Sequence, residues 1–383
     1  MKYIPRLAPV LLGVLLLALA TCSAGQELPP PPGLPTSAAL ASLPQVSPSA
    51  LPITPPPTVT QPPASPTPPP SPTPTPAPVL RPLTAGGCCV EPFWSPDGQR
   101  LLFLDRPSPD AVTGLYEVSL QGRGVELYTE RLGIYSPDMS LLAFPQGEQT
   151  VVERLADGQQ WVIPSGGRAV SFSPDGTQLA WSAGQVGQPL DTARREVWVS
   201  QVDGSQAQLL VQLYSGGFAG WFPDGRLLVS GRLDLNEPLP GLWAVSPQDG
   251  SQSLLARGER LRGVNISPGG SWLSYQMVFS ANQEENGIWL VDTHSAEKRR
   301  LDQFGAYRWR DDGRLLLIPL DTSQPFHQIW QVDAATGQAQ PLTYPAITPL
   351  KIANGDWSVS PDGTKIAFVS ATDNNVWLLE LPE

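Results

Sequence analysis

Five charged side chains stand at the start of segments that the sequence predicts as the innermost strands of a repeating β-structure. A ring of mixed charge at the ends of such strands can recognise a small polar ligand or the end of a peptide. The alternative is that these side chains pair with one another or with water. The five residues are Glu91, Arg168, Arg262, Arg308 and Asp356.

Acidic side chains in a long predicted loop form a second candidate group. Asp234 and Glu237 lie in the segment 231–240, and functional residues concentrate on variable loops that a rigid scaffold holds. Such carboxylates can meet a cationic partner or hold Ca²⁺, or they can be the ordinary surface of an acidic protein. No stretch matches a calcium-binding loop motif. We therefore expect no metal and no cofactor, and we take all seven charged residues as a candidate binding face.

Cys88 and Cys89 are adjacent in the chain. Neighbouring Cα atoms lie about 3.8 Å apart, which is below the separation of about 4.4–6.8 Å that is usual for a disulfide. A vicinal disulfide between them would be strained and readily reduced, and the alternative is two small, partly buried thiols. The chain has three cysteines in all, so it does not encode a disulfide framework.

The chain offers few residues for nucleophilic or metal catalysis. Its two histidines, His294 and His327, occupy unrelated positions of the repeat described below. Neither the His-Glu-x-x-His pattern of metalloproteases nor the Gly-x-Ser-x-Gly pattern of serine hydrolases occurs. A pair of carboxylates could still meet across a channel for glycoside chemistry. We therefore expect a non-catalytic protein, with an enzyme as the alternative.

These residues are positioned by a repeat that runs through most of the chain. A bulky residue, a Ser-Pro-Asp-Gly turn or a variant of it, and an apolar run recur at intervals of about 37 to 50 residues, near the period of a four-stranded propeller blade. In this turn proline presets φ, aspartate bonds to the nearby backbone and glycine takes a positive φ. We expect the bulky residue to pack between blades. The seven copies begin at Trp94, Tyr135, Phe172, Trp221, Ile266, Trp309 and Val359.

A strand with a central aromatic residue, such as Gly241–Val245, follows most copies. The copy at Tyr135 has Val151–Leu155 instead, with no aromatic residue. The last copy stops after its third strand, and Val79–Thr84 resembles the fourth strands of other copies. We expect Val79–Thr84 to cover that open edge, because exposed edge strands promote aggregation. The sequence thus predicts an all-β, seven-bladed β-propeller over residues 79–383, closed by an N-terminal strand.

Residues 1–22 are typical of a secretory signal peptide. A short basic region precedes the apolar run Leu7–Ala20, which is too short for a comfortable membrane span. Leu19-Ala20-Thr21-Cys22 resembles a bacterial lipobox, which would make Cys22 the acylated first residue. The alternatives are ordinary cleavage near Ala24 and a retained anchor helix that ends near Gly25. Each of these places the rest of the chain outside the cytoplasmic membrane.

Residues 23–78 are rich in proline, threonine and serine, and no charged residue occurs between positions 28 and 80. Such a composition cannot form a packed core, so we expect a disordered linker biased toward polyproline II. At about 3.1 Å per residue it could reach roughly 150 Å. It would hold the propeller away from a membrane.

The Ser-Pro-Asp-Gly hairpins and the following Ile/Val-Trp strand resemble the WD40-like (PD40) repeats of TolB-type propellers. The resemblance covers roughly residues 79–383. Together with the lipobox-like sequence, it implies the bacterial lipoprotein form of such a propeller. TolB itself has a small α/β domain where this chain has its proline-rich tract. The resemblance is specific for fold.

The net charge of −11 makes the chain a poor ligand for nucleic acid or anionic lipid. We expect a membrane-tethered, extracytoplasmic binding or scaffolding propeller that binds a protein, a peptide or a cell-wall polymer through its long loops. One alternative is an extracytoplasmic enzyme, a hydrolase or lyase that acts on glycan or peptide. Another is a TolB-like component of an envelope complex.

Overall fold

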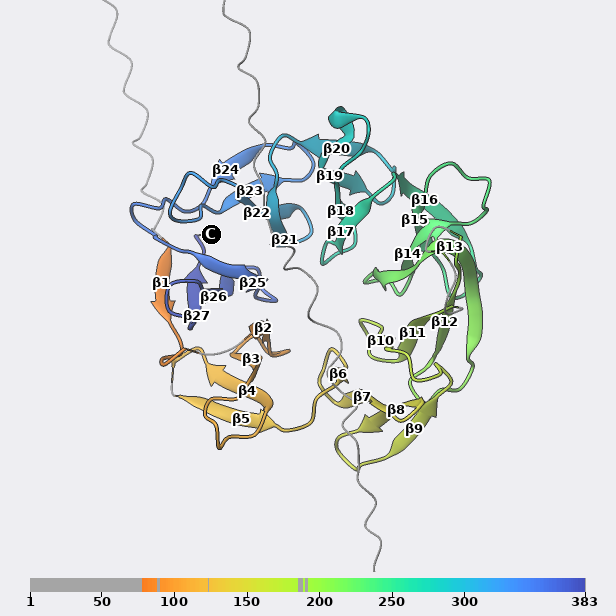
Figure 1. The fold of residues 1–383 in the computed structure, drawn as a ribbon, viewed down its shortest axis with the longest axis horizontal. Coiled ribbons are helices and arrows are strands. Elements are labelled where there is room, and N and C mark those ends of the chain that lie inside the picture. The colour runs from red at the N-terminus through yellow and green to blue at the C-terminus, as the bar shows by residue number, and fades with distance from the viewer. Residues whose placement is uncertain (1–77, 88–89, 123, 185–188, 190–191, 383) are drawn as a thin grey trace, which may run out of the picture. The chain divides into compact units, whose positions relative to one another are not determined.

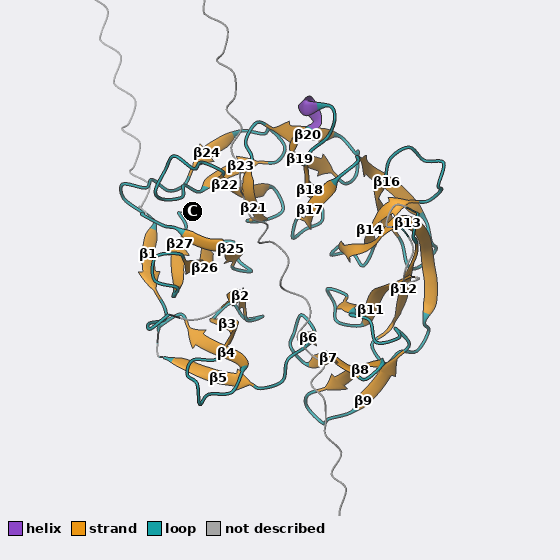
Figure 2. Ribbon diagram, viewed as in Figure 1, coloured by secondary structure: helices purple, strands orange, loops and turns teal. Residues whose placement is uncertain are grey.

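The structure of the protein is a computed structural model that describes residues 78–87, 90–122, 124–184, 189 and 192–382. All of these belong to the compact unit Ser71–Glu383. The predicted signal peptide and linker, Cys22 and the pair Cys88-Cys89 lie outside the described residues. Within the described part, strands and loops are accompanied by a short 3₁₀ helix, η1 (Gln283–Glu285) (Figure 2). No helix found there is long and apolar enough to cross a membrane.

The strands form six antiparallel sheets around a central axis, which is the architecture of a β-propeller (Figure 1). Sheet 1 consists of β2 (Val90–Trp94), β3 (Arg100–Asp105), β4 (Gly114–Ser119) and β5 (Val125–Thr129). Sheet 2 consists of β6 (Ile134–Tyr135), β7 (Leu141–Gln146), β8 (Gln149–Arg154) and β9 (Gln160–Ile163). Sheet 3 consists of β10 (Ser171–Phe172), β11 (Gln178–Gly184), β12 (Arg194–Gln201), β13 (Gln208–Trp221), β14 (Leu227–Arg232), β15 (Gly241–Val245) and β16 (Gln252–Arg257).

The remaining three sheets complete the ring. Sheet 4 consists of β17 (Leu261–Ile266), β18 (Trp272–Met277), β19 (Gly287–Asp292) and β20 (Lys298–Leu301). Sheet 5 consists of β21 (Gly305–Trp309), β22 (Arg314–Pro319), β23 (Trp330–Asp333) and β24 (Ala339–Pro341). Sheet 6 consists of β25 (Ile352–Val359), β26 (Lys365–Ser370), β27 (Val376–Glu380) and β1 (Val79–Pro82). The strands nearest the axis are β2 in sheet 1, β6 in sheet 2, β17 in sheet 4, β21 in sheet 5 and β25 in sheet 6 (Figure 1).

Sheet 3 corrects the prediction of seven separate blades. The described residues form five four-stranded blades and one seven-stranded sheet. The cause is β13, whose 14 residues pair with β12 at one end and with β14 at the other. No loop separates these two pairings. At Gly216 the chain passes so close to β14 that a Cβ atom would lie 1.9 Å from the Ser230 carbonyl oxygen, so glycine allows the strand to continue. The copies that begin at Phe172 and Trp221 therefore share one strand.

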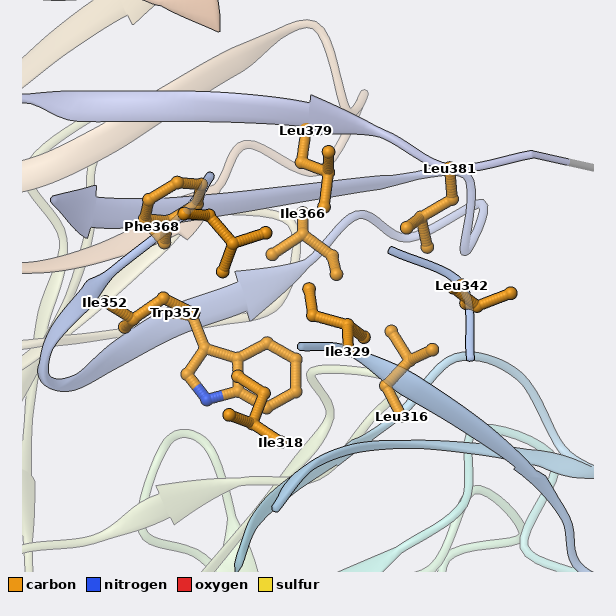
Figure 3. Close-up of a cluster of buried hydrophobic side chains, with 11 residues drawn as sticks. Leu316, Ile318, Ile329, Leu342, Ile352, Trp357, Ile366, Phe368, Leu379 and Leu381 are labelled. Carbon is orange, nitrogen blue, oxygen red and sulfur yellow. The ribbon is translucent and has the colours of Figure 1, made fainter. Parts of the chain in front are cut away.

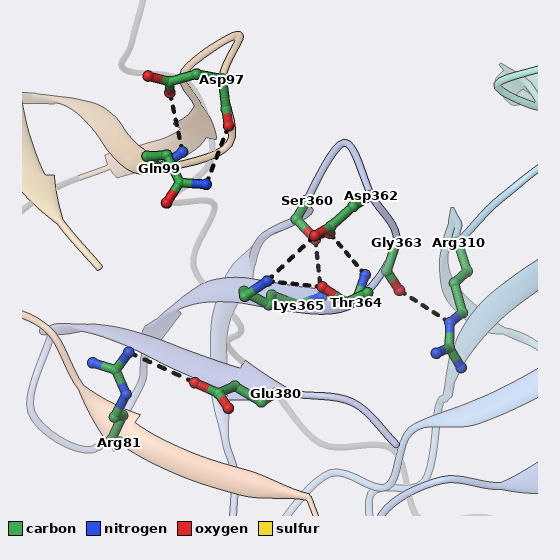
Figure 4. A network of polar contacts seen from close by, with 10 residues as sticks. All are labelled: Arg81, Asp97, Gln99, Arg310, Ser360, Asp362, Gly363, Thr364, Lys365 and Glu380. Atoms are coloured by element: carbon green, nitrogen blue, oxygen red, sulfur yellow. Dashed lines mark hydrogen bonds and ion pairs between the residues drawn. The ribbon is translucent and has the colours of Figure 1, made fainter. Parts of the chain in front are cut away.

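The predicted closure of the ring by an N-terminal strand is confirmed. β1 pairs antiparallel with β27, from Val79 opposite Glu380 to Pro82 opposite Trp377. An ion pair of 3.7 Å between Arg81 Nη2 and Glu380 Oε1 accompanies this pairing (Figure 4). The edge that the last copy would leave open is therefore covered.

The Ser-Pro-Asp-Gly turns are held by their own side chains. In the last copy, the Ser360 hydroxyl accepts from the Lys365 amide at 2.9 Å and donates to Asp362 Oδ1 (Figure 4). The same carboxylate oxygen accepts from the Thr364 amide at 3.0 Å. Three other turns repeat the serine–aspartate bond: Ser95–Asp97, Ser136–Asp138 and Ser173–Asp175. The motif therefore defines a local hydrogen-bonded structure.

The turn at Ser267 lacks its own aspartate, because Gly269 stands in that position. Asp312, from the next turn along the chain, accepts from the Ser267 hydroxyl and from the Ser271 amide at 3.1 Å. A Cβ atom at Gly269 would lie 2.5 Å from Asp312 Cγ, so the glycine makes room for this carboxylate. Arg310 of the Asp312 turn likewise donates to the Gly363 carbonyl of sheet 6 at 3.0 Å (Figure 4). The turns thus link sheets 4, 5 and 6.

Buried apolar clusters lie where neighbouring sheets face each other. Five clusters join sheet 6 to 1, 2 to 3, 3 to 4, 4 to 5 and 5 to 6, and one joins the two halves of sheet 3. Figure 3 shows the cluster between sheets 5 and 6, which includes Leu316, Ile329, Ile366 and Phe368. Among the described residues, no such cluster joins sheet 1 to sheet 2.

The bulky residue of each turn copy shows the same difference. Trp94, Phe172, Trp221, Ile266, Trp309 and Val359 belong to these clusters or pack against them, as predicted. The indole nitrogens of Trp221 and Trp309 also donate to carbonyl groups of the preceding innermost strand. Tyr135 of β6 is the exception, because it belongs to none of the six clusters and instead lines a cavity between sheets 1 and 2.

Candidate functional site at the loop face

The innermost strands begin at the end of the propeller that carries the long loops. In sheet 5, Gly305 of β21 pairs with Pro319, the last residue of β22. In sheet 6, Ile352 of β25 pairs with Ser370, the last residue of β26. We call this end the loop face, and the opposite end, with the Ser-Pro-Asp-Gly turns, the turn face.

Four innermost strands are irregular toward their loop-face ends. The pairing register shifts in β2, β13, β17 and β25. Each irregular stretch holds a residue with positive φ: Glu91 at 53°, Ser215 at 62°, Gly263 at 59° and Asn354 at 49°. Bulges re-aim side chains, and left-handed conformations are uncommon for residues other than glycine. Backbone strain of this kind recurs at binding sites, which makes the loop-face mouth a site candidate.

A cavity of about 290 Å³ opens among three successive sheets at this end. Its volume is at the lower end of the range of ligand pockets, roughly 300–1,000 Å³. Most of its walls are apolar, with Gln276 and His327 as the polar side chains. It is lined by Gln276 of sheet 4, by Phe304, Gly305, Ala306, Ile318, Pro319, Leu320 and His327 of sheet 5 and its loops, and by Ile352, Gly355 and Trp357 of sheet 6.

His327 joins the loops of sheets 5 and 6 in the wall of this cavity. Its amide donates to the Leu350 carbonyl at 2.8 Å, and its Nδ1 accepts from the Ile352 amide at 3.1 Å. Burial, followed by the charge of Lys351, lowers the pKa of His327 below its usual value. The imidazole is therefore neutral at pH 7, and its Nδ1 is engaged as an acceptor.

Arg308 is a half-buried cation beside the same wall. Its guanidinium lies over the ring of Trp357, with Cζ 5.4 Å from the ring centroid, and its Nη1 donates to the Tyr307 carbonyl at 2.9 Å. Burial lowers the pKa of Arg308, yet the group stays charged at pH 7. No carboxylate of the described residues forms an ion pair with it. The guanidinium can therefore accept a carboxylate or another anionic group from a ligand.

Exposed apolar side chains also occur in the loops of this face. Among the large apolar side chains of the described residues, Phe279 and Leu320 are 78% exposed and Ile347 is 68% exposed, the highest values. All three lie in long loops of the loop face, after β18, β22 and β24. Exposed apolar side chains gathered around a concave site are typical of interaction surfaces.

The other predicted residues lie in several different environments. Arg262 and Asp356 stand on the irregular stretches of β17 and β25, and Arg168 donates to the Gly184 carbonyl at 3.0 Å in sheet 3. Glu237 pairs with Arg257 at 3.0 Å, and this hydrogen bond is the main cause of its lowered pKa. Asp234 is exposed and accepts from the Asn236 amide at 2.7 Å.

Two of these predicted residues make contacts within their own part of sheet 3. The ion pair occupies Glu237, and a turn of its own loop occupies one carboxylate oxygen of Asp234. No ion pair of the described part joins any two of Glu91, Arg168, Arg262, Arg308 and Asp356. Of these five, Arg308 lies over Trp357 of the cavity wall, and Asp356 stands in the chain between Gly355 and Trp357, which both line the 290 Å³ cavity.

The apolar part of this site was missed by the sequence analysis. Phe304 and Leu320 flank strands of sheet 5, and Trp357 belongs to β25 of sheet 6. Their proximity therefore depends on the packing of two neighbouring sheets rather than on their spacing in the sequence. One signal was present, because large apolar residues such as Leu320 stand in otherwise polar loops. Among the described residues, no group of three His, Cys, Asp or Glu side chains is arranged to hold a metal ion.

Comparisons with known proteins concern the fold. An oligogalacturonate lyase from Vibrio parahaemolyticus is 16% identical, covering 79% of this chain and 94% of the lyase, with a TM-score of 0.57. An oligogalacturonate lyase in complex with manganese is 18% identical, covering 79% of this chain and 93% of that one, with a TM-score of 0.55. The chain has a β-propeller fold. A putative TolB from Agrobacterium tumefaciens is also similar, at 17% identity over 67% of this chain and 80% of that one, with a TM-score of 0.36.

No family model matches the sequence, and no curated protein matches it either. The two lyases share the propeller architecture at an identity below 20%. The similarity to these lyases therefore shows the fold alone. The WD40-like assignment of the repeats and the lipoprotein form stay predictions.

Proposed function

We propose that this protein is an extracytoplasmic, membrane-tethered binding propeller that holds a protein, a peptide or a cell-wall polymer on its loop face. Residues 79–383 form the propeller, whose seven-stranded sheet acts as two blades that share β13. Residues 23–78 serve as the spacer, and Cys22 is the lipid attachment site. The binding face includes Glu91, Arg168, Arg262, Arg308 and Asp356, together with Asp234 and Glu237. Cys88 and Cys89 stay a candidate vicinal disulfide.

The observation that carries this proposal is the combination at the loop-face cavity. An apolar cavity of about 290 Å³ is bordered by the unpaired guanidinium of Arg308 and by the exposed side chains of Phe304 and Leu320. Apolar walls supply affinity, and a few placed polar groups supply orientation. This combination supports the proposed role of Arg308 and Asp356 on this face.

Crosslinking in intact cells that express the full chain tests the binding role. The variant Leu320→Asp/Ile347→Asp should lose a defined crosslinked partner, because both side chains are exposed and their replacement disturbs no core. Val162→Asp is the matched control, since Val162 is an exposed apolar residue on the outer strand β9. Equal recovery of every partner with both variants would contradict a loop-face binding role.

Membrane fractionation of the variant Cys22→Ala tests the anchor. Lipidation at Cys22 predicts that this variant leaves the membrane fraction or accumulates with an uncleaved signal. A variant that stays in the membrane at its mature size would identify the N-terminal apolar run as the anchor.

A second candidate is an extracytoplasmic enzyme that cleaves glycan or peptide. The name shared by the two lyases above supplies a specific substrate to test, oligogalacturonate. Purified protein should be incubated with oligogalacturonate with and without Mn²⁺, and unsaturated products measured. Turnover abolished by Arg308→Ala would favour the enzyme, whereas no turnover in either condition would favour the binding propeller. A TolB-like role in an envelope complex is a third candidate, and it would show as an envelope protein among the crosslinked partners.

A further inference from the structure

The boundary between sheets 1 and 2 differs from every other boundary of the ring. It holds a cavity of about 500 Å³ in place of a buried apolar cluster. The lining runs from the loop face, at Leu104 and Leu132, to the turn face, at Pro96 and Met139. The cavity therefore extends along the length of the boundary.

Apolar side chains line this boundary without closing it. Leu102, Leu115, Leu142 and Val151 are buried but belong to none of the six clusters. At the other boundaries, the corresponding positions interdigitate with the neighbouring sheet. Further apolar side chains of sheets 1 and 2 remain substantially exposed to solvent, namely Phe93, Leu104, Leu132 and Ile134.

Two local features accompany the cavity at this boundary. The innermost strand β6 has only two residues, and it follows Gly133, where a Cβ atom would lie 2.5 Å from the Ala143 carbonyl oxygen. Toward the outside, polar contacts bridge the boundary. Arg131, between β5 and β6, makes two hydrogen bonds to Glu153 of β8 and lies over the ring of Phe144, with Cζ 5.7 Å from its centroid. An ion pair therefore links the segment that connects the two sheets to β8 of sheet 2.

The charged residue that lines the cavity is Glu91. It occupies the bulge of β2 with φ of 53°, its side chain is exposed, and no described cation pairs with it. The chain as a whole carries a net charge of −11. Both the local and the overall charge therefore favour a cationic occupant.

We propose that the boundary between sheets 1 and 2 is a second binding site, which receives an extended peptide segment with alternating apolar and basic side chains from a partner protein. The other boundaries show what fits such a space, because strand-borne Leu, Ile, Val and Phe side chains fill them. A peptide strand would insert its apolar side chains and supply the missing cluster, and a lysine or arginine beside them would pair with Glu91. This site is separate from the loop-face cavity.

A peptide-binding measurement on the full chain tests this proposal. The probe is a fluorescent eight-residue peptide that alternates lysine with valine or leucine. One control peptide replaces each lysine by glutamate, and another replaces each apolar residue by serine. We expect the probe to bind at least about tenfold more tightly than either control, because both apolar burial and charge contribute.

Variants locate the bound probe. Leu132 is 45% exposed in the loop before β6, so Leu132→Asp should weaken probe binding about tenfold or more by charging the cavity wall. Glu91→Gln should weaken it about fivefold and reduce its salt dependence, since the lost contact is an exposed ion pair. Val162→Asp and Leu320→Asp should leave it unchanged, because they lie on the outer strand and at the loop-face cavity. These controls also separate this proposal from the binding role of the loop face.

Four results would overturn the proposal. If the serine control peptide binds as tightly as the probe, the interaction depends on charge alone. If the Leu132→Asp variant binds the probe as tightly as the native chain does, the probe binds elsewhere. Sedimentation of the unliganded protein tests whether a second copy of this chain occupies the boundary. A dimer that the substitution Leu132→Asp dissociates would show that it does. Absence of binding by the probe would equally refute the proposal, while leaving the crosslinking result at the loop face unaffected.

Discussion

The boundary between sheets 5 and 6 and the boundary between sheets 1 and 2 occupy equivalent places in the ring but differ in construction. The first buries eleven apolar side chains from both sheets (Figure 3). The second has a cavity of about 500 Å³ and an ion pair between Arg131 and Glu153. The comparison shows that the propeller need not seal every boundary, because the remaining clusters and the paired termini already close the ring.

This difference separates residues that hold the fold from residues free to bind. Where a buried apolar cluster exists, substitution of one of its side chains should lower the free energy of unfolding or unfold the protein. Where a side chain is exposed at the cavity, as at Leu104 and Leu132, substitution should alter binding and change the free energy of unfolding little. The following expectations, ordered from the largest effect to the smallest, test that separation.

The largest effect is expected for Phe368→Ala in the cluster between sheets 5 and 6. Phe368 is 1% exposed, and truncation of a buried phenylalanine costs about 3–5 kcal/mol through lost transfer energy and the cavity left behind. Leu104→Ala at the open boundary should cost about 1 kcal/mol or less, since the side chain is already partly exposed. Denaturant midpoints of the two variants give the comparison, and similar losses would show that both boundaries are packed.

An intermediate effect is expected for Asp312→Ala on the turn face. The substitution removes the acceptor of the buried Ser267 hydroxyl, which costs about 1–3 kcal/mol when the donor is left unsatisfied. Gly269→Asp in the same chain should recover much of that loss, because it restores the Ser-Pro-Asp-Gly form once the Asp312 carboxylate no longer fills the space. Thermal unfolding of the single and double variants measures this, and a double variant less stable than Asp312→Ala would refute the compensation.

The ion pair at the open boundary predicts a specific pH dependence. Arg131, followed by Gln160, lowers the pKa of Glu153 to about 2, below the value of about 4.3 expected in the unfolded chain. Its contribution to stability is therefore present above about pH 4.3 and is lost as the pH falls toward about 2. Glu153→Gln should be less stable than the native chain at pH 7, and this difference should shrink over that interval. A difference that is constant with pH would mean that the carboxylate charge does not bridge the sheets.

The smallest effect on stability is expected for Leu132→Asp. The side chain is exposed in the loop before β6 and belongs to no cluster, so its free energy of unfolding should change by no more than about 0.5 kcal/mol. Denaturant unfolding measured alongside the peptide titration checks this. A large loss of stability would show that Leu132 seals the boundary.

The turns and the closing strand were predictable from the sequence. The turns depend on hydrogen bonds between residues close in the chain, and the closing strand completes a copy of the repeat that lacks its fourth strand. Ser360 and Asp362 bond within a single turn, so their residue types suffice to predict it. The closing strand followed from a last copy without a fourth strand and a matching segment at Val79–Thr84. Seven separate blades were not a safe inference, because the continuity of β13 through Ser215 and Gly216 depends on pairing with β14.

The sites were less predictable because they combine residues of neighbouring sheets. Arg308 and Asp356 were recognised from their position in the repeat, but the apolar cavity beside them depends on Trp357 and Leu320 meeting across two sheets. The open boundary had a sequence signal of its own. The copy at Tyr135 lacks the aromatic third strand and has Met139, with φ of 60°, where other turns have glycine. That signal identified an atypical copy but did not reveal a cavity.

Hydrogen exchange of the full chain tests the central claim most directly, because it compares the boundaries without substitution. The amides of β6 pair only with β7 beside the open boundary, whereas those of β21 and β25 lie beside packed clusters. Amides flanked by few buried apolar contacts open more often, so we predict that Ile134, Tyr135 and Ser136 exchange at least about tenfold faster than the amides of β21. Equal protection of these segments would contradict the open boundary.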